Sequence, residues 1–277
     1  MVQGINDRVR LSREGYSTTI AIQLAHKKNA LDFETADEIS QAIKVAGDGD
    51  SRCIVLRSEG DVFCAGADLA LLEILASKDS DTVRRLIYEK FQGLIRSIRH
   101  CPVPVICLLQ GPALGVGADV ALSCDAIVAS EVAWMELTWS RLGLIPALGS
   151  AYELSGTVGR RHALEILLQP TRITAQRALA AGLVNRVAAD EDLELELLEF
   201  TGIMTQHDRS TLVSTKALLL QASAPDRFND HLEDAAKLQA TLVSSPIFRA
   251  NLSALQARVA GITAASDNSG VSPEDAP

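Results

Sequence analysis

Apolar and polar positions recur with two different periods along the first part of the chain. The segments VRLSREG (9–15) and TTIAIQL (18–24) alternate or run apolar around a Glu-Gly turn, which predicts two paired strands. The next segment, FETADEISQAIKVAG (33–47), has helical spacing and ends in glycine. The chain therefore begins with a strand, a strand and a helix.

The same theme recurs up to about residue 190. Apolar segments with β-branched or aromatic residues predict further strands at RCIVLRS (52–58), VPVICLLQG (103–111), AIVAS (126–130) and VAWMEL (132–137). Helical or glycine-rich stretches lie between them, without an exact internal repeat. We therefore expect an α/β core over residues 1–190.

Beyond residue 190 the pattern is helical throughout. Residues 191–262 contain successive helix-periodic segments whose apolar stripes exceed what one α/β face can cover, so we expect a helical domain that mediates oligomerisation. The last segment, TAASDNSGVSPEDAP (263–277), is small, polar and proline-bearing, and we expect it to form a disordered tail.

Composition narrows the classes of partner. The chain has 277 residues, of which 47% are hydrophobic and 22% charged, with a formal net charge of −9. Nucleic acid and anionic membrane surfaces select clusters of Lys and Arg in excess, so neither is an expected partner, and any phosphate-bearing ligand must be bound locally. The chain shows no apolar leader and no apolar run near the ~20 residues of a membrane span, so the cytoplasm is the expected compartment.

The cysteines indicate the redox setting. Five of them lie in apolar runs without CxxC or histidine spacing: Cys53, Cys64, Cys101, Cys107 and Cys124. We read them as buried thiols of a reducing compartment and predict neither a disulfide nor a metal site.

Candidate chemistry begins at FCAGADL (63–69). Small residues on either side of Gly66 let a ligand lie against the backbone, and Asp68 can cap the next helix. The alternative interpretation is a plain helix N-cap. A second loop, GPALGVGADVALSCD (111–125), places glycines before a helix, so that N–H groups near Val116 and Gly117 point out of its positive end. Two such loops, each after a buried strand, make a paired donor site for an oxyanion.

These segments resemble the crotonase superfamily, the enoyl-CoA hydratase/isomerase family. The resemblance rests on HKKNALD (26–32), GDVFCAGADL (60–69), the stretch 101–130, LGLIP (142–146) and ITAQRALAAGLVNRV (173–187), in order from about residue 8 to about residue 260. It implies an α/β spiral of ββα units with a helical C-terminal trimerisation domain, in homotrimers often paired as hexamers. It also implies an acyl-CoA substrate, with coenzyme A as part of that substrate and no separate cofactor.

The resemblance implies a site as well. The backbone N–H groups of Ala67 and Val116 would hold the thioester carbonyl oxygen, and Lys28 would lie near the CoA phosphates. Polarising that carbonyl stabilises an enolate, which identifies the substrate class but leaves the reaction to the acid and base around the acyl group. The residues expected to line the substrate site are Lys28, Ala30, Ala65, Gly66, Asp68, Gly115, Gly117, Trp139 and Ala147.

The chain departs from the family pattern at its acids. Typical hydratases of the family carry one Glu just after the second loop's glycines and another before a Gly-x-x-Pro segment. These positions hold Asp119 and Trp139, and the position that some isomerases use holds Ala147. A further departure is Val116, where many relatives have glycine; a β-branched residue narrows the allowed φ and crowds the pocket.

Each of these residues has a functional and a structural interpretation. Asp119 is either a catalytic or water-orienting carboxylate or an acid favoured by the helix dipole. Trp139 is either an apolar wall or a stacking surface for the substrate. Strand alternation places Glu136 on the face opposite Trp139, Glu153 is expected to be solvated or paired, and His100 and His162 are expected to cap helices.

Three functions remain open at this point. The first is a hydratase- or isomerase-type lyase that uses Asp119 as its only acid. The second is a relative with diverged chemistry, such as decarboxylation or thioester hydrolysis. The third is a non-catalytic acyl-CoA binding protein that kept the two loops and lost the acid/base pair.

Overall fold

The computed structural model describes residues 3–222 and 225–269. Its strands are β1 (Gln3–Asn6), β2 (Val9–Glu14), β3 (Ser17–Ile22), β4 (Cys53–Ser58), β5 (Val105–Leu109), β6 (Ala113–Leu114), β7 (Ala126–Ser130), β8 (Trp134–Glu136), β9 (Ile173–Thr174) and β10 (Arg186–Ala188). The strands expected at 9–15, 18–24, 52–58, 103–111, 126–130 and 132–137 are present, and each begins and ends within two residues of the expected bounds.

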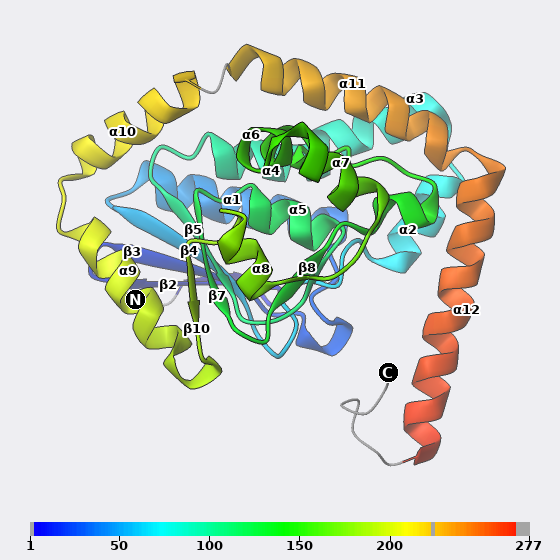
Figure 1. Ribbon diagram of the computed structural model, residues 1–277, viewed down its shortest axis with the longest axis horizontal. Coiled ribbons are helices and arrows are strands. Elements are labelled where there is room, and N and C mark those ends of the chain that lie inside the picture. The colour runs from blue at the N-terminus through cyan, green and yellow to red at the C-terminus, as the bar shows by residue number, and fades with distance from the viewer. Residues whose placement is uncertain (1–2, 223–224, 270–277) are drawn as a thin grey trace.

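Helices separate and follow the strands (Figure 1). They are α1 (Phe33–Asp48), α2 (Leu69–Ala76), α3 (Ser80–Leu86), α4 (Gln92–Arg99), α5 (Val116–Leu122), α6 (Ser150–Thr157), α7 (Gly159–Leu168), α8 (Ala175–Ala180), α9 (Leu193–Thr205), α10 (Arg209–Ala222), α11 (Pro225–Val243) and α12 (Pro246–Ser269). Shorter turns are η1 (Ala25–Lys27), the π-helical η2 (Ile87–Phe91), η3 (Thr138–Leu142) and η4 (Asp190–Asp192). None of these helices combines the length and apolar character that a membrane crossing requires.

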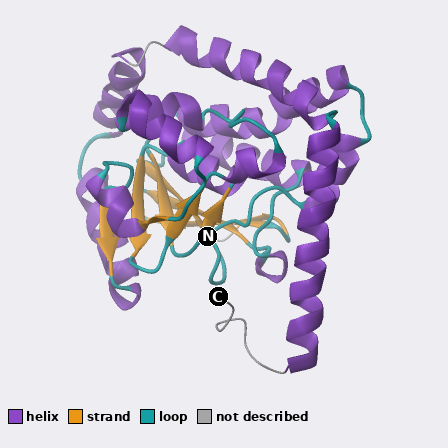
Figure 2. Cartoon of the chain, turned by 45° about the vertical axis from the view of Figure 1, so that its right-hand side comes forward, coloured by secondary structure: helices purple, strands orange, loops and turns teal. Residues whose placement is uncertain are grey.

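A seven-stranded sheet carries the core, in the order β1-β2-β3-β4-β5-β7-β10. The first three strands pair antiparallel, and the pairs from β3–β4 through to β7–β10 are parallel. Helices lie above one face of this sheet (Figure 2). β5 and β7 are buried throughout, which explains their continuous apolar runs.

A second, small sheet sits where the glycine-rich loops meet. It has the order β6-β8-β9, with β6 parallel to β8 and β8 antiparallel to β9. The sequence did not predict the two-residue strands β6 and β9, because their pairing depends on contacts far apart in the chain. This small sheet fixes the position of the second loop relative to residues 134–136.

Helices that follow β10 pack into the same hydrophobic core as the strands. The main apolar cluster contains Ile20, Leu56 and Leu109 together with Phe228 and Leu232 of α11. α9 covers the other face of the large sheet, where Leu193 and Leu197 pack against residues of β4, β5 and β7. The change of pattern at residue 190 is therefore a change of element type within one continuous core.

The helices after β10 lie around the outside of the α/β core (Figure 1). α11 contacts α3, and α12 contacts α2 and η3. α12 extends through Ser269, so the part of the expected disordered tail that covers 263–269 is helical, where two alanines favour continuation of the helix. The remainder of that tail, 270–277, lies outside the described residues.

Candidate active site

The first loop is held in place by a short parallel bridge to the segment before α1. Leu31 pairs with Ala67, so that the Leu31 N–H donates to the Gly66 carbonyl and the Asp68 N–H donates to the Leu31 carbonyl. In such a bridge the N–H of the central residue points away from its partner strand. The Ala67 N–H is therefore directed away from Leu31.

Glycines make the approach of the two loops possible. A Cβ on Gly117 would lie 2.6 Å from both the Cβ and the carbonyl oxygen of Cys64, so only glycine fits there. Gly115 adopts φ 49° and ψ −116°, which favours glycine at the N-cap of α5. Burial raises the pKa of the Cys64 thiol to about 12, so this side chain stays protonated at neutral pH.

The two loops present two amides without protein partners. Cys64 bridges Ala113, which brings residues 64–67 beside residues 113–117. Within residues 3–222 and 225–269, neither the Ala67 N–H nor the Val116 N–H donates to a protein acceptor. Val116 begins α5, so the positive end of that helix lies behind its amide.

The two positions expected to carry the family's acids contact each other. The indole N–H of Trp139 donates to Asp119 Oδ2 at 2.8 Å. Asp119 has no exposed surface, and Trp139 is 7% exposed. Trp139 is therefore more than the apolar wall considered from the sequence, because its indole N–H donates to one oxygen of the Asp119 carboxyl group.

Burial changes the acidity of this carboxyl. It raises the pKa of Asp119 from 3.8 to about 7, and the Ser150 hydroxyl, the Trp139 indole and the Ser150 amide offset only part of that rise. No hydrogen bond of acceptable geometry ends at Asp119 Oδ1 in the described part of the chain. Asp119 can therefore exist as an acid or as a carboxylate near neutral pH. Ser150 was not among the residues that the sequence singled out, because its approach depends on the start of α6.

Ala147 is held by hydrogen bonds to its backbone. Its carbonyl accepts from Gln92 Nε2 at 2.7 Å, and the same amide nitrogen donates to the Leu232 carbonyl of α11. Nearby, Gln239 accepts from the Ile145 N–H. Ala147 is 1% exposed. The stretch that follows Trp139 is therefore fixed by α4 and α11, and it offers no acid at this position.

A cavity of about 780 Å³ opens beside the two loops. Its lining includes Ala65 of the first loop and Leu114 of the second, together with residues of β8, η3, the segment before β9 and α12. Three arginines line it, Arg141, Arg172 and Arg258. The guanidinium of Arg172 lies over the Trp134 ring, 4.3 Å from its centroid. In a chain with a net charge of −9, this concentration of cations favours an anionic ligand.

Glu136 is the acid of this cavity that the sequence argument set aside. It is 5% exposed, and its Oε1 lies 2.5 Å from Arg141 Nη2. The carboxylate therefore faces the same space as Ala65 and Leu114. No sequence pattern indicated this, because the register of β8 against β6 decides which way Glu136 points.

The remaining substrate-site candidates lie around the first loop. Lys28 is exposed in a left-handed turn with φ 52°, and its carbonyl accepts from the Ala65 N–H. Ala30 is half-buried in the same turn. Asp68 caps α2 through the Ala70 N–H and pairs with Lys27 at 3.1 Å. The structure thus brings Lys28, Ala30 and Ala65 together. The Asp68 carboxylate is already bound by the Ala70 N–H and the Lys27 ammonium group.

Other side chains singled out from the sequence serve the fold. Glu153 forms an ion pair with Arg99. His100 is the C-cap residue of α4, and His162 lies in the first turn of α7 with Nδ1 3.4 Å from the Val158 carbonyl oxygen. No cluster of three or more His, Cys, Asp or Glu placed to hold a metal ion occurs among the described residues.

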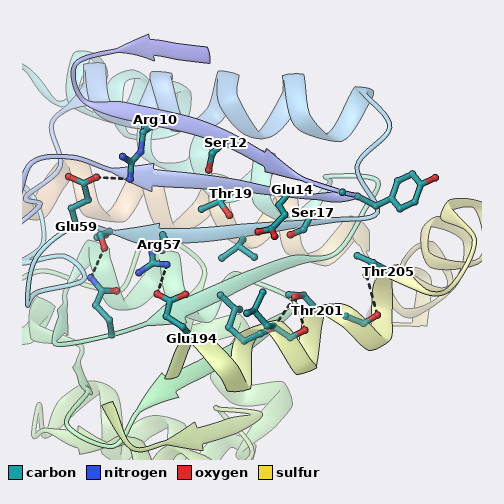
Figure 3. Close-up of a pocket in the computed structure, with 18 of the residues that line it drawn as sticks. Arg10, Ser12, Glu14, Ser17, Thr19, Arg57, Glu59, Glu194, Thr201 and Thr205 are labelled. Carbon is teal, nitrogen blue, oxygen red and sulfur yellow. Dashed lines mark hydrogen bonds and ion pairs between the residues drawn. The ribbon is translucent and has the colours of Figure 1, made fainter. Parts of the chain in front are cut away.

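A second groove of about 780 Å³ lies elsewhere, between the outer face of β2, β3 and β4 and helix α9 (Figure 3). Its charged side chains pair with one another: Arg10 with Glu59 at 2.8 Å and Arg57 with Glu194 at 2.6 Å. No residue of 63–67 or 113–117 lines this groove, and its compensated charges leave no net cation for an anionic ligand.

Comparison with known proteins decides the family. The family model described as enoyl-CoA hydratase/isomerase matches residues 14–256. The chain belongs to the enoyl-CoA hydratase/isomerase family. The resemblance inferred from the sequence motifs, and the crotonase-like α/β fold it implied, are therefore confirmed.

Relatives support this assignment along most of the chain. The probable enoyl-CoA hydratase echA6 of Mycobacterium bovis is 34% identical over 197 residues, which cover 70% of this chain and 77% of the relative. The probable enoyl-CoA hydratase echA14 of Mycobacterium tuberculosis is 29% identical over 258 residues, or 91% and 98% of the two chains. A crystal structure of an enoyl-CoA hydratase from Mycobacterium avium subsp. paratuberculosis matches with a TM-score of 0.81 at 26% identity, covering 91% of this chain and 96% of the other.

Proposed function

We propose that this member of the enoyl-CoA hydratase/isomerase family binds acyl-CoA thioesters and holds the thioester carbonyl oxygen with the N–H groups of Ala67 and Val116. The observation that carries the proposal is the pair of amides on adjoining loops that have no protein acceptor within the described chain. Two donors aimed at one oxygen stabilise the enolate as negative charge develops, and one such donor is typically worth about 3 kcal/mol of barrier.

The surroundings of the loops suit the rest of such a ligand. Arg141, Arg172 and Arg258 line the adjoining cavity, and Lys28 is exposed beside Ala65. Phosphates of coenzyme A are strong anions that guanidinium and ammonium groups bind well. We propose that CoA passes along this side of the loops.

The proposed reaction is of hydratase or isomerase type, with Asp119 as the acid left from the usual pair. A pKa of about 7 suits a group that both gives and takes a proton near neutral pH. Asp119 is fully buried, so it reaches an acyl group only if that group enters the space beside Trp139.

The Trp139–Asp119 hydrogen bond supports a second candidate function. Because the Trp139 indole hydrogen-bonds the Asp119 carboxyl group, polarisation of the thioester carbonyl by the two amides is the main contribution left for any chemistry. A decarboxylase or a thioester hydrolase can use this polarisation as its main catalytic contribution. A non-catalytic acyl-CoA binding protein needs the two amides for binding alone. The aromatic ring beside the acid also suits a cyclic or aromatic acyl group.

Two measurements test the proposal. Calorimetry should show that an acyl-CoA binds the purified protein much more tightly than the corresponding free acid; equal or absent binding of both contradicts the thioester site. Incubation with enoyl-, β-ketoacyl- and aryl-CoA thioesters, followed by mass spectrometry, then identifies products. Bound thioester without any product supports the non-catalytic alternative.

We also propose a homotrimer, alone or paired as a hexamer. The helices after β10 expose large apolar side chains, among them Leu195, Leu198 and Ile203 on α9 and Leu218 on α10. Such faces are costly in water unless another surface covers them. Light scattering at micromolar concentration should give three or six times the chain mass of 29.6 kDa, and a stable monomer contradicts the proposal.

A further inference from the structure

We infer that Glu136 is a proton-transferring carboxylate of this site, which exchanges a proton with the α-carbon of the bound thioester. The inference rests on the proposed function. It assigns to the cavity side of the loops an acid/base group that neither Trp139 nor Ala147 supplies.

The backbone places Glu136 beside the second amide. In the parallel pair β6–β8, Glu136 lies opposite Leu114, and the Gly115 N–H donates to the Glu136 carbonyl at 2.9 Å. The residue after Gly115 is Val116, whose free amide is proposed to hold the carbonyl oxygen. Glu136 is therefore tied by its own main chain to the loop that polarises the substrate.

The side chain faces the space a substrate would use. Glu136, Ala65, Leu114 and Thr138 all line the cavity beside the loops. Asp119 and Trp139 instead bury their polar atoms against each other. Of the two carboxylic acids Glu136 and Asp119, Glu136 is the one directed into the cavity that borders both loops.

Arg141 prepares this carboxylate for its task. Its Nη2 lies 2.5 Å from Glu136 Oε1 and also donates to the Pro170 carbonyl at 2.9 Å. The ion pair holds the Glu136 side chain at the wall of the cavity, which makes Arg141 a positioning residue.

The step is balanced within the site. A Glu136 carboxylate oxygen takes the proton from the thioester α-carbon, the C–H electron pair forms the Cα=C bond, and the carbonyl π pair moves to the oxygen held by Ala67 and Val116. The products are an enolate and a neutral Glu136. The neutral Glu136 carboxyl exchanges its proton with D2O. Transfer of a deuteron back to the α-carbon restores the thioester and the carboxylate, so the α-position becomes deuterated.

Deuterium exchange tests this without knowledge of the natural acyl group. The intact protein is incubated with butyryl-CoA in D2O, and mass spectrometry follows the α-deuterium, with calorimetry of butyryl-CoA binding in parallel. Glu136→Gln should slow exchange by roughly 10²- to 10⁴-fold and leave affinity within a few-fold, since a positioned base is typically worth that much. The matched control is Glu131→Gln, an exposed glutamate in the turn after β7, which should change neither.

Further variants separate proton transfer from a structural role. Glu136→Asp keeps a carboxylate and should recover part of the exchange, whereas a purely structural role predicts no such rescue. Arg141→Gln removes the ion-pair partner that holds the Glu136 side chain, so exchange should slow.

The outcomes separate the two proposals. If the intact protein does not bind butyryl-CoA, the thioester site itself is wrong. If it binds without exchange, or if exchange survives in Glu136→Gln and disappears in Asp119→Asn, the thioester site stands and the assignment of Glu136 is overturned. Thermal unfolding of each variant shows whether it still folds. If Glu136→Gln does not fold, the exchange rates of Glu136→Asp and Arg141→Gln decide whether Glu136 transfers the proton.

Discussion

Trp139 donates its indole N–H to Asp119 Oδ2 at 2.8 Å, across 20 residues of sequence. In the family pattern these two positions are expected to hold the acids of a hydratase. In this chain one of these positions holds an aromatic residue, which hydrogen-bonds the carboxyl group at the other position. The acid that remains is therefore part of the packed core as well as of the proposed site.

Removing the indole donor should destabilise the fold. Trp139→Phe leaves a buried carboxyl oxygen without its partner, and an unsatisfied buried polar group costs roughly 1–3 kcal/mol. The pKa of Asp119 should also rise further, because the indole hydrogen bond holds it down. Urea unfolding measures the first effect. The control is Trp134→Phe, at a half-buried residue stacked under Arg172, which should cost less than about 1 kcal/mol. Equal losses in both variants contradict the role of the hydrogen bond.

Asp119 should make stability depend on pH. Its folded pKa of about 7 exceeds its ordinary value of 3.8, so between these values the folded state binds a proton that the unfolded state has released. The free energy of unfolding should therefore fall as pH rises from about 4 to about 7, by at most ~4 kcal/mol from this group. Asp119→Asn lacks this component, so the difference between variant and parent, followed by denaturant unfolding at several pH values, should change over that window. A constant difference contradicts the raised pKa.

Gly117 should not tolerate alanine. A methyl group there would lie 2.6 Å from Cys64 Cβ and from the Cys64 carbonyl oxygen, so the two loops must separate. Overpacking of this kind costs roughly 1–3 kcal/mol, and acyl-CoA affinity should fall because the two amides move apart. The matched variant is Gly156→Ala in α6, where no heavy atom lies within 4 Å of the added carbon. It should be neutral or slightly stabilising, and a binding loss in that variant would show that the effect is not specific to the loops.

Hydration of crotonyl-CoA by the unaltered protein should be slow. Hydration needs a group at the water and a group at the α-carbon, and Asp119 is buried against Trp139. Asp119→Asn should abolish residual hydration with little change in acyl-CoA affinity. Trp139→Glu should raise the rate, since an additional positioned acid/base group is typically worth 10²–10⁴.

That gain should come with a stability cost. The smaller side chain leaves a cavity worth ~3 kcal/mol or more, and two buried carboxyls then face each other. Loss of the conjugated thioester absorbance follows hydration, and thermal unfolding follows stability. Rapid hydration by the unaltered protein that survives Asp119→Asn would show that Asp119 is not the group that serves the water.

The sequence by itself determined the class of fold and the two loops. The periods of its apolar residues predicted β2, β3, α1, β4, β5 and β7, because strands and helices leave local signatures that survive without tertiary contacts. Ordered motifs then identified the family, and Gly115 and Gly117 marked the place where backbone must approach backbone. These features depend on neighbouring residues and on steric limits that any chain of this sequence carries.

Only the tertiary structure decided what the acids do. Trp139 meets Asp119, Glu136 faces the cavity, and α11 joins the core of the strands through register and packing between segments far apart in the chain. A one-residue change of register in β8 would turn Glu136 away from the cavity without altering the apolar pattern that predicted the strand. Side-chain direction and burial, and with them the pKa of Asp119, are properties of the assembled core, so a sequence pattern alone does not contain them.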